Sequence, residues 1–505
     1  MFRYLFALLL FFLWRLPAFA QGYFNERYTN SNSGYQSGLT NIVPLDSGGY
    51  LGFGQADNYP YLGSKVLQLR WLDAQGQQTQ LRYFGQPGRL HYSTFDAGLM
   101  VVPGGYALAG SVSLNNGENQ ATLWRFSSQG DSLWYHQYDS ATIATSACRT
   151  LDGGYMIVGN VVTSFNPVDG DVMLLRTDSL GNKQWLRHFG MGFSDEGYSI
   201  APTPDGGFLV GGVVTYQTAS TNSDAFVYKL DSLGNEQWHH TYGGSREDNW
   251  SKVRVLSDGN YLVAMSLWQA VINGYHQYRT LVVKLTPQGQ ELWRRYVGPT
   301  RKNQVLFSLL ELADGSVVIA GSHSDPTGAQ PVGNGYPEGF AFKLCADGDS
   351  VWFRSYKKLS GSRSHNYLRD FRLAPDGGFI GAGFLFAVAP DTGSNDSWAF
   401  KVDAHGYLQP GGTPPMVPCA PLGIAPPASA VLVDLWPNPT PDGHFTLEAE
   451  PGATLTITDA LGRTISTTSN LAPGTSHLLP RPGLYLLRLT WPDGRSTTHK
   501  LLRSQ

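Results

Sequence analysis

Two pairs of adjacent acidic residues are the first groups in this sequence that could act on a substrate. Asp195 and Glu196 form one pair, and Glu247 and Asp248 form the other. Glycosidases use paired carboxylates as acid and as base or nucleophile. However, Asp195 and Asp248 each lie ten residues before an Asp-Gly turn, and Asn366 holds the same place in a later copy of that pattern. This recurrence across the repeated units favours loop capping over catalysis.

A second acidic set opens several predicted strands and could ligate calcium. No Asp-x-Asp-x-Asp-Gly loop accompanies it, so the sequence does not support a calcium site. The patterns Gly-x-Ser-x-Gly, His-Glu-x-x-His and the P-loop are also missing. No catalytic residue, metal site or cofactor is therefore assigned. The members of this acidic set are Asp171, Asp224, Glu338 and Asp396.

The three cysteines do not form a metal or redox motif, because no Cys-x-x-Cys pair occurs. Cys148 lies in an apolar stretch and is predicted to be a small buried residue. A Cys345–Cys419 disulfide, which would tie a linker to the main domain, is one alternative, and free thiols are the other. The odd number of cysteines leaves at least one thiol unpaired.

Side chains suited to ligand binding are concentrated in three loop stretches of variable length. They are "GGSREDNW" (243–250), "WQAVINGYHQYR" (268–279) and "SGSRSHNYLRD" (360–370). Binding sites usually lie on variable loops of a rigid scaffold, and planar, hydrogen-bonding groups suit sugars or peptides. The alternative is that these residues only decorate solvated loops. The candidate binding residues are Arg246, Trp250, Tyr275, His276, Arg363, His365 and Tyr367.

These loops interrupt a repeated sequence. The phrase "RTDSLGNKQWLRHFG" (176–190) returns as "KLDSLGNEQWHHTYGG" (229–244), with weaker copies elsewhere. A second phrase precedes each copy, as in "DGGYMIVGN" at Asp152 and "DGGFLVGGV" at Asp205. Together the two phrases define seven units of roughly 50 to 60 residues.

Each unit predicts four short strands, because its Asp-Gly and Gly-Asn pairs supply the positive φ that tight hairpin turns need. Four-stranded units in series indicate a β-propeller. The predicted fold class is all-β, a seven-bladed β-propeller followed by a small C-terminal immunoglobulin-like β-sandwich. One tryptophan per unit is predicted to pack between neighbouring blades. These repeated residues are Trp134, Trp185, Trp238, Trp293 and Trp352.

The seventh unit lacks its last strand. After "DSWAFKVDAHG" (396–406) no tryptophan strand follows, whereas "GYFNERYT" (22–29) carries Phe24 and Tyr28 four residues apart. Trp352 and Tyr356 have the same spacing. Residues 22–29 are therefore predicted to form the outer strand of the last blade, which would remove the open sheet edge.

This pattern resembles the bacterial β-propeller repeats known as SBBP repeats, which are common in exported proteins. The resemblance extends from about Asp46 to Gly406 and is carried by the turn and tryptophan positions. It implies a fold more than an activity, since propellers have many unrelated functions.

The N-terminus predicts export. Arg3 precedes an apolar run from Leu5 to Leu13, and Ala18-Phe19-Ala20 matches a signal-peptidase site. A membrane anchor is the alternative, but the run is too short to span a bilayer. The formal net charge of −3 provides no basic surface, so nucleic acid is not an expected partner. No other stretch predicts a transmembrane anchor.

The C-terminus begins with a Pro-, Gly- and Ala-rich linker and continues with alternating strand patterns. Its motifs are "VDLWPNPTPDGHFTLE", "LTITDALGRTI" and "LPRPGLYLLRLTWPDGRSTTHKLL". They resemble the type A C-terminal sorting domain of the type IX secretion system; an ordinary immunoglobulin-like module is the alternative. The resemblance implies the type IX machinery of a Bacteroidota-type cell as a partner, with the tail later removed or used for surface attachment. The matching residues are Pro437, Asn438, Pro439, Gly462, Gly483, Tyr485 and Lys500.

The predicted domains are a signal peptide (1–20), the propeller (21–409), the linker (410–430) and the sorting domain (431–505). The leading hypothesis is a secreted or cell-surface, non-catalytic propeller that crosses the periplasm and outer membrane and binds glycan or protein. A hydrolase or lyase acting on polysaccharide at the loop-rich face is the first alternative. A structural component of a surface layer is the second.

Overall fold

The computed structural model contains only β-structure in the part of the chain that it describes, which confirms the all-β class. No helix in this part has the length and apolar character needed to cross a membrane. The predicted signal peptide and nearly all of the predicted linker lie outside it. The described residues are 22–29, 36–57, 65–86, 88–93, 98–114, 117–140, 143–165, 168–216, 222–244, 246, 248–272, 275–299, 302–324, 336–361, 363–392, 395–409, 419, 433–436, 440, 442–449, 451–472, 474–492 and 496–503.

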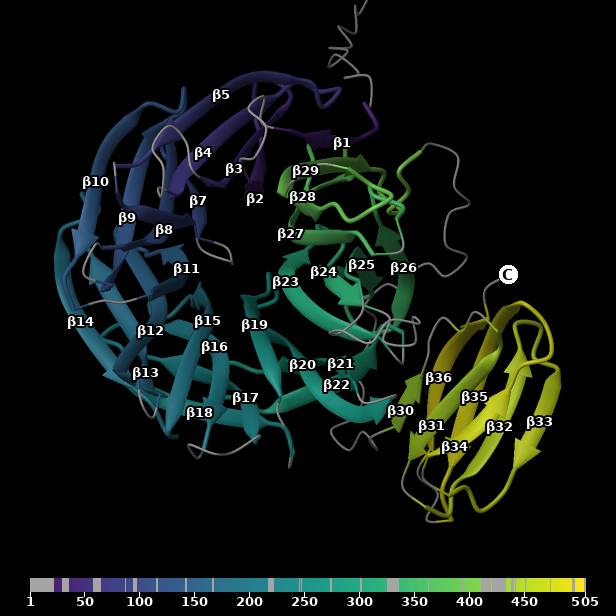
Figure 1. Ribbon diagram of the computed structural model, residues 1–505. Helices are drawn as coiled ribbons and strands as arrows, with labels where there is room; N and C mark the ends of the chain where they lie inside the picture. The colour runs from purple at the N-terminus through teal and green to yellow at the C-terminus, as the bar shows by residue number, and fades with distance from the viewer. Residues whose placement is uncertain are drawn as a thin grey trace, which may run out of the picture.

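Most strands pair antiparallel in sets of four, which we number as units along the chain, and the units follow one another around a ring (Figure 1). Unit 1 comprises β2 (Ser37–Pro44), β3 (Tyr50–Asp57), β4 (Lys65–Leu72) and β5 (Gln78–Phe84). Unit 2 comprises β7 (Leu99–Val102), β8 (Gly105–Ser113), β9 (Asn119–Ser127) and β10 (Ser132–Tyr138). Unit 3 comprises β11 (Ile143–Arg149), β12 (Tyr155–Phe165), β13 (Val168–Thr177) and β14 (Lys183–Phe189). Unit 4 comprises β15 (Ser194–Pro202), β16 (Phe208–Thr215), β17 (Ser223–Leu230) and β18 (Glu236–Tyr242). Unit 5 comprises β19 (Asn249–Val255), β20 (Tyr261–Ile272), β21 (Tyr275–Leu285) and β22 (Glu291–Val297). Unit 6 comprises β23 (Asn303–Glu311), β24 (Val317–Ser324), β25 (Glu338–Leu344) and β26 (Ser350–Tyr356). Unit 7 comprises β27 (His365–Leu373), β28 (Phe379–Phe386), β29 (Asn395–Val402) and, from the other end of the chain, β1 (Phe24–Tyr28); the extra strand β6 (Leu90–Ser93) pairs with β8.

The strand β1 completes unit 7 as an antiparallel partner of β29. Its register places Phe24 opposite Lys401, next to Phe400. Side chains strengthen the pairing, since Arg27 Nε donates to Asp396 Oδ2 at 2.7 Å and Trp398 Nε1 donates to Asn25 Oδ1 at 2.7 Å. The edge of β29 is thus covered by residues that precede it by more than 350 positions in the chain.

Unit 7 is also bonded to unit 1 near the inner end of the sheets. The backbone N–H of Ile42 on β2 donates to Asp370 Oδ2 on β27 at 2.9 Å. The same kind of bond joins units 6 and 7, where Phe371 N donates to Ser308 Oγ at 2.9 Å. Short polar side chains on the first strand of one unit therefore bond the backbone of the first strand of the next unit. Such a bond is also present between units 7 and 1, where the ring closes.

An aromatic residue on the fourth strand packs against a glycine in the second turn of the following unit. In unit 2, Trp134 contacts Gly181, where an added Cβ would lie 2.8 Å from the indole. Phe24 occupies the same place against Gly76 of unit 1. These glycines also have positive φ, so the turn needs glycine for both its conformation and its close contact. The remaining contacts of this kind are Trp185 with Gly234, Trp238 with Gly289, Trp293 with Gly348 and Trp352 with Gly406.

The tyrosine four residues after the aromatic residue often bonds the same glycine. Tyr138 Oη donates to the carbonyl of Gly181 at 2.7 Å, and Tyr28 Oη donates to that of Gly76 at 2.7 Å. The spacing of four places both side chains on one face of the strand, where they contact the next unit together. The repeated Trp–Tyr spacing and the repeated Gly turn are therefore two halves of one contact between units.

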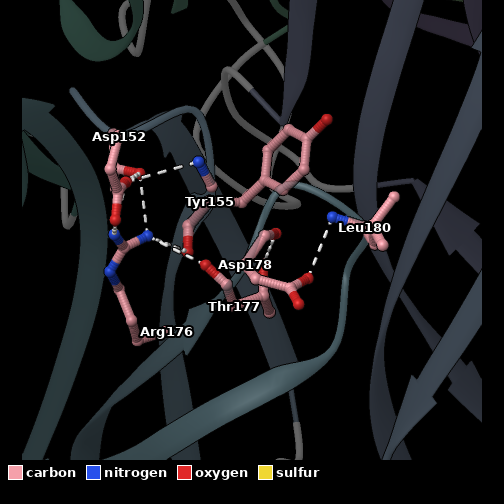
Figure 2. Close-up of polar contacts among 8 residues, drawn as sticks. Asp152, Tyr155, Arg176, Thr177, Asp178 and Leu180 are labelled. Carbon is pink, nitrogen blue, oxygen red and sulfur yellow. Dashed lines mark hydrogen bonds and ion pairs between the residues drawn. The ribbon is translucent and has the colours of Figure 1, made fainter.

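A buried cation on the third strand pairs with the aspartate of the Asp-Gly turn in the same unit. In unit 3, Arg176 donates to Asp152 at 2.6 Å and to the carbonyl of Thr177 at 2.9 Å, as Figure 2 shows. In unit 4, Lys229 Nζ donates to Asp205 Oδ2 at 2.8 Å. The pair ties the first hairpin to the strand that follows it. The equivalent pairs are Asp258–Lys284, Asp314–Lys343 and Asp376–Lys401.

The C-terminal residues form two antiparallel sheets that share a core containing Phe445, Leu455, Leu487 and Leu501. Among the residues matched to the sorting motif, Pro437–Pro439 lie outside the described residues. Gly462 has positive φ in a turn, and Tyr485 is buried with its hydroxyl bonded to the carbonyl of Arg481. Gly483 begins β35 and Lys500 lies in β36. The strands are β30 (Val433–Trp436), β31 (His444–Ala449) and β34 (Thr475–Leu478) in one sheet, and β32 (Thr454–Asp459), β33 (Thr464–Thr468), β35 (Gly483–Thr490) and β36 (Ser496–Arg503) in the other.

Two of the three cysteines form a disulfide. Cys345, in the turn after β25, is bonded to Cys419, and Cys148 is a free, buried thiol. Of the two alternatives that the sequence leaves open, the structure selects the bridge. The bridge fixes one point of the linker to unit 6.

Candidate functional site

The carboxylates of Asp195 and Asp248 bond backbone amides of the loops before them, which confirms the loop-capping interpretation. Asp195 Oδ2 accepts hydrogen bonds from Met191 N at 3.1 Å and Gly192 N at 3.0 Å, and its side chain is 1 % exposed. Asp248 accepts from Gly244 N at 3.2 Å. In unit 7, Asn366 Oδ1 accepts from Lys358 N at 2.8 Å. Both aspartates are therefore buried beneath the loops that they cap.

Burial and neighbouring charges raise the pKa values of the two capping aspartates. Burial, and secondarily the charge of Asp224, raise the pKa of Asp248 to about 7. Burial likewise raises the pKa of Asp195, where Asp171 adds to the effect. Glu196 accepts a bond from the hydroxyl of Tyr198 on the same strand. Glu247 lies outside the described residues.

The acids that open the third strands have separate roles. Asp171 and Asp224 lie beside the capping aspartates, Glu338 pairs with Lys357 at 3.3 Å, and Asp396 binds Arg27. Within the described ranges, no group of three or more His, Cys, Asp or Glu side chains could hold a metal ion.

The candidate residues of units 4 and 5 do not form one described cluster. Arg246 is exposed, and its guanidinium lies 5.7 Å from the centre of the Trp268 ring. Trp250 lies in β19, while Tyr275 and His276 begin β21. The side chains of these last three residues lie outside what the structure describes. Their backbone positions place them near the hairpin β20–β21.

The candidates of unit 7 do come together. His365 and Tyr367 lie two residues apart on β27, with ring centres 5.6 Å apart. Arg363 Nε donates to Tyr336 Oη at 3.2 Å, and the Tyr336 ring lies 5.5 Å from His365. Tyr336, a residue that the sequence did not single out, thus joins Arg363 to His365, and His365 in turn contacts Tyr367.

Two phenylalanines on the neighbouring strand extend this cluster. Phe386 lies directly opposite His365 in the β27–β28 register, and Phe384 lies opposite Tyr367. The ring centres are 5.3 Å apart in the first pair and 4.6 Å apart in the second, which is stacked. Phe386 is 41 % exposed, so the outer end of the cluster is open to solvent. We call the rings of Tyr336, His365, Phe386, Tyr367 and Phe384 the aromatic track.

The inner end of the aromatic track meets Arg369. This residue is the extra residue of a β-bulge in β27, and its guanidinium lies 5.1 Å from the ring centre of Phe384 and 5.6 Å from that of Tyr367. Its third ring is Phe307, at 4.4 Å, which occupies the equivalent bulge of β23 in unit 6. Bulges redirect side chains, and here two of them bring a cation and a ring together between units.

Burial lowers the pKa values of two residues in or beside the aromatic track. Burial lowers the pKa of His365, so the imidazole is neutral at pH 7. Burial also lowers the pKa of Arg369, to about 10, which leaves it charged at neutral pH. The track is therefore a row of neutral rings with an arginine at each end, Arg363 outside and Arg369 inside.

Sequence reasoning found three members of this site and missed the others. Phe384 and Phe386 were overlooked because they belong to a hairpin strand and not to a loop. The alternation of a strand places His365 and Tyr367 on one face and Phe384 and Phe386 on one face. This alternation could have been recognised from the sequence. The strand register that places the rings opposite each other could be seen only in the folded structure.

A cleft of about 430 Å³ lies elsewhere, between the outer strands of units 4 and 5. Its walls include His240 and Tyr242 of β18 and Glu291, Arg294 and Tyr296 of β22. Here His240 Nε2, and not the tyrosine, is bonded to the carbonyl of Gly289, at 2.8 Å. The cleft therefore lies at the joint where a histidine–glycine hydrogen bond replaces the tyrosine–glycine hydrogen bond of other joints.

Comparison with solved structures finds several chains to which this one is similar over most of its length. The chain is similar to the Pan2 WD40 domain of Neurospora crassa (TM-score 0.42, 8 % identity, 72 % of this chain and 89 % of that chain). It is also similar to the Cps50 (Swd1) β-propeller domain of Myceliophteria thermophila (TM-score 0.38, 11 % identity, 74 % and 99 %). A third similar structure is the GH93 α-L-arabinofuranosidase of Fusarium graminearum (TM-score 0.40, 11 % identity, 75 % and 97 %).

Sequence comparison identifies a short similarity only. No family model matches the chain. The regulatory protein FlaEY of Caulobacter vibrioides is 29 % identical over 130 residues, which are 21 % of this chain and 14 % of that protein. The chain thus spans about a seventh of that relative. The β-propeller fold follows from the repeated four-stranded units that succeed one another around the ring (Figure 1).

Proposed function

We propose that this protein is an exported, non-catalytic, seven-bladed β-propeller that binds glycan through the aromatic track of unit 7. The supporting observation is the row of rings from Tyr336 to Phe384, which opens to solvent at Phe386. Sugar rings carry apolar C–H faces that pack on aromatic rings, and hydroxyls that bond to arginine and tyrosine.

Binding is favoured over hydrolysis because the described acidic candidates serve structural contacts. Asp195, Asp248 and Asp396 are buried and bonded to loops or strands of the scaffold. A glycosidase needs two carboxyl groups facing a bound sugar, about 5 to 10 Å apart. In the described residues, the contacts that build the aromatic track join rings, a guanidinium and a tyrosine hydroxyl.

The binding proposal is tested by glycan-array screening of the full chain and of its variant Phe386→Ser. We expect wild-type protein to retain a set of glycans and the variant to bind them at least fivefold more weakly. Leu373→Ser is the matched control, since Leu373 is 46 % exposed at the other end of β27. Equal loss in the two variants, or no glycan bound, would contradict the proposal. Release of reducing sugar from a bound polysaccharide would favour a hydrolase, and cleavage that leaves an unsaturated product would favour a lyase.

We further propose delivery by the type IX secretion system, with a signal peptide over residues 1–20 and a sorting domain over residues 431–505. The sequence motifs support this, and the two C-terminal sheets with their own core suit a separable domain. Removal of residues 431–505 should leave the propeller in the periplasm of a type IX-competent host. Unchanged appearance outside the cell would argue against the sorting role.

A further inference from the structure

The cleft between units 4 and 5 has charged and apolar walls. On β22, Arg294 donates to Glu291 through Nε at 2.7 Å and also through Nη2, and we call this two-pronged ion pair the fork. The buried side chains of Leu267, Leu281 and Leu285 line the cleft as well. Its volume of about 430 Å³ lies within the range of about 300–1,000 Å³ that is usual for small-ligand sites.

A β-bulge places the two charged residues on one face of β22. Glu291 and Trp293 pair with consecutive residues of β21, so Leu292 is the extra residue. A bulge shifts the alternation of side chains along the strand by one position. Glu291 and Arg294, which are three positions apart, therefore both line the cleft.

The joint between units 2 and 3 shows the same contact without a fork. There Tyr138 Oη donates to the carbonyl of Gly181 at 2.7 Å. Leu186, which directly follows Trp185, packs against the core cluster that contains Tyr138. In unit 5 the residue that directly follows the tryptophan is Arg294. A position that an aliphatic side chain fills in unit 3 thus carries a charged side chain in unit 5.

In the joint between units 4 and 5, a histidine bonds the turn glycine and leaves the tyrosine to the cleft. His240 Nε2 bonds the carbonyl of Gly289 at 2.8 Å, so this joint does not use the hydroxyl of Tyr242. Burial raises the pKa of Tyr242 to about 12, and the charges of Glu291 and Arg294 also act on it. The tyrosine hydroxyl and the fork therefore belong to one cleft.

These groups suit a neutral ligand that carries hydroxyls beside C–H faces. The fork is neutral overall, and a charged ligand would have to displace one of its partners. Because the fork uses Nε and Nη2 of Arg294, Nη1 can donate to a ligand, while the oxygens of Glu291 can accept. The hydroxyl of Tyr242 can donate or accept, and the leucines suit C–H groups. A wholly apolar ligand would bury the fork without bonding it, which costs free energy.

We propose that this cleft is a second saccharide site, which binds a short neutral sugar chain at the outer strands of units 4 and 5. The fork bonds two neighbouring hydroxyls, Tyr242 bonds a third, and the sugar ring packs on the leucines. The site shares no residue with the aromatic track of unit 7. It can therefore be present or absent independently of the glycan binding proposed for the track.

The site is tested in full-length protein that carries Phe386→Ser, so that the aromatic track is impaired. Isothermal titration calorimetry compares the neutral probes cellotetraose, xylotetraose and mannotetraose with two charged probes, tetragalacturonate and the tetramer of glucosamine. We expect at least one neutral probe to bind at least about fivefold more tightly than both charged probes. No binding of any neutral probe, or a smaller margin over the charged probes, overturns the proposal.

Two further substitutions assign the binding to the cleft. Arg294→Leu introduces the residue type of unit 3 and removes the fork, and we expect about tenfold weaker binding of the neutral probe. Tyr242→Phe removes a hydroxyl that the joint does not use, and should weaken binding about fivefold. His239→Leu is the matched control, because His239 directly follows Trp238 and bonds Glu236 at 2.6 Å, outside the described lining of the cleft. It should change the affinity by less than about twofold.

Urea unfolding of each variant checks that the fold is retained. If Arg294→Leu unfolds, Tyr242→Phe and the preference among the probes decide the test. A folded Arg294→Leu or Tyr242→Phe variant that binds as tightly as the His239→Leu control overturns the proposal.

The outcomes also separate this cleft from the aromatic track. Binding that persists in Phe386→Ser and is lost on adding Arg294→Leu supports the cleft, whatever the track binds. If Phe386→Ser abolishes all saccharide binding, the cleft proposal is overturned and the proposed function of the track is left intact.

Discussion

The repeated aspartates and basic residues act as unequal partners. Lys229 has a side chain that is 1 % exposed, whereas Asp205 is 52 % exposed. Burial raises the pKa of Asp205, but bonds from Lys229, Thr203 and Gly207 outweigh it and bring the pKa to about 2. Removing the aspartate leaves a buried ammonium without its carboxylate, while removing the lysine leaves a carboxylate that water can reach.

This asymmetry predicts different costs for the two halves of the pair. We expect Asp205→Ala to lower the free energy of unfolding by about 2–3 kcal/mol. Lys229→Met should cost about 1 kcal/mol, because the methionine can occupy the buried space. Asp231→Ala, which removes an exposed cap of the second turn, is the control, with an expected cost below about 1 kcal/mol. Urea unfolding monitored by tryptophan fluorescence measures all three, and equal costs for Asp205→Ala and Lys229→Met would contradict this interpretation.

A second residue-scale prediction concerns Asp248, whose pKa in the folded protein is about 7. In the unfolded chain an aspartate has a pKa near 4, so between about pH 4 and pH 7 the folded protein holds one more proton at this site. Stability contributed by Asp248 is therefore highest at low pH and is lost as the pH rises through 7. Asp248→Asn should make the protein about 1–2 kcal/mol more stable than wild type at pH 8, with no gain at pH 4.5.

The asparagine in this test copies what the chain already uses in unit 7, where Asn366 caps the equivalent loop. Urea midpoints at pH 4.5 and pH 8 provide the measurement. A gain of the same size at both pH values would assign the effect to packing and not to proton binding.

At the scale of elements, the joint between units is built from two segments far apart in the repeat. The aromatic residue of one fourth strand contacts the glycine in the second turn of the next unit, and a tyrosine or histidine often bonds that glycine's carbonyl. Phe24 and Tyr28 make the same joint from the N-terminal strand.

Loss of β1 should therefore weaken the whole ring at one joint. A chain that begins at residue 31 would expose the edge of β29 and leave Gly76 without its aromatic partner. We expect its thermal midpoint to fall by several degrees and its tendency to aggregate to rise. A peptide of residues 21–30 should restore the midpoint, and the same peptide with Phe24→Ala should not. An unchanged midpoint in the truncated chain would show that β1 is dispensable.

At the scale of the whole molecule, one covalent bond joins unit 6 to the linker. Cys345 and Cys419 are 74 positions apart, and the loop that they close includes the strands β27, β28 and β29 of unit 7. The disulfide therefore restrains the same region that β1 closes. Cys148 stays reduced in the core, where burial raises the pKa of its thiol to about 12.

Thiol counting tests this arrangement. With Ellman's reagent, the native protein should show no reactive thiol, because Cys148 is buried and protonated. Unfolding in urea without reductant should reveal one thiol, and unfolding with prior reduction should reveal three. Two additional thiols before reduction would mean that the bridge is not formed. The variant Cys148→Ala should remove the single thiol and leave the count otherwise unchanged.

The sequence by itself determined the all-β class, the repeat and the loop-capping role of Asp195, Asp248 and Asn366. These features are local, because turn residues set the hairpins and spacing along a strand sets which side chains share a face. The pairing of Phe24 and Tyr28 with the last unit was also predicted from their spacing, and the structure places β1 against β29.

Only the tertiary structure decided which separated residues form a site. It brought Tyr336, His365, Phe384 and Phe386 into one row and set Arg369 between rings of two units. It also chose the disulfide over free thiols. These contacts depend on strand register, on bulges and on the angle between neighbouring units. Those quantities arise from packing across the ring, and the spacing of residues along the chain does not contain them.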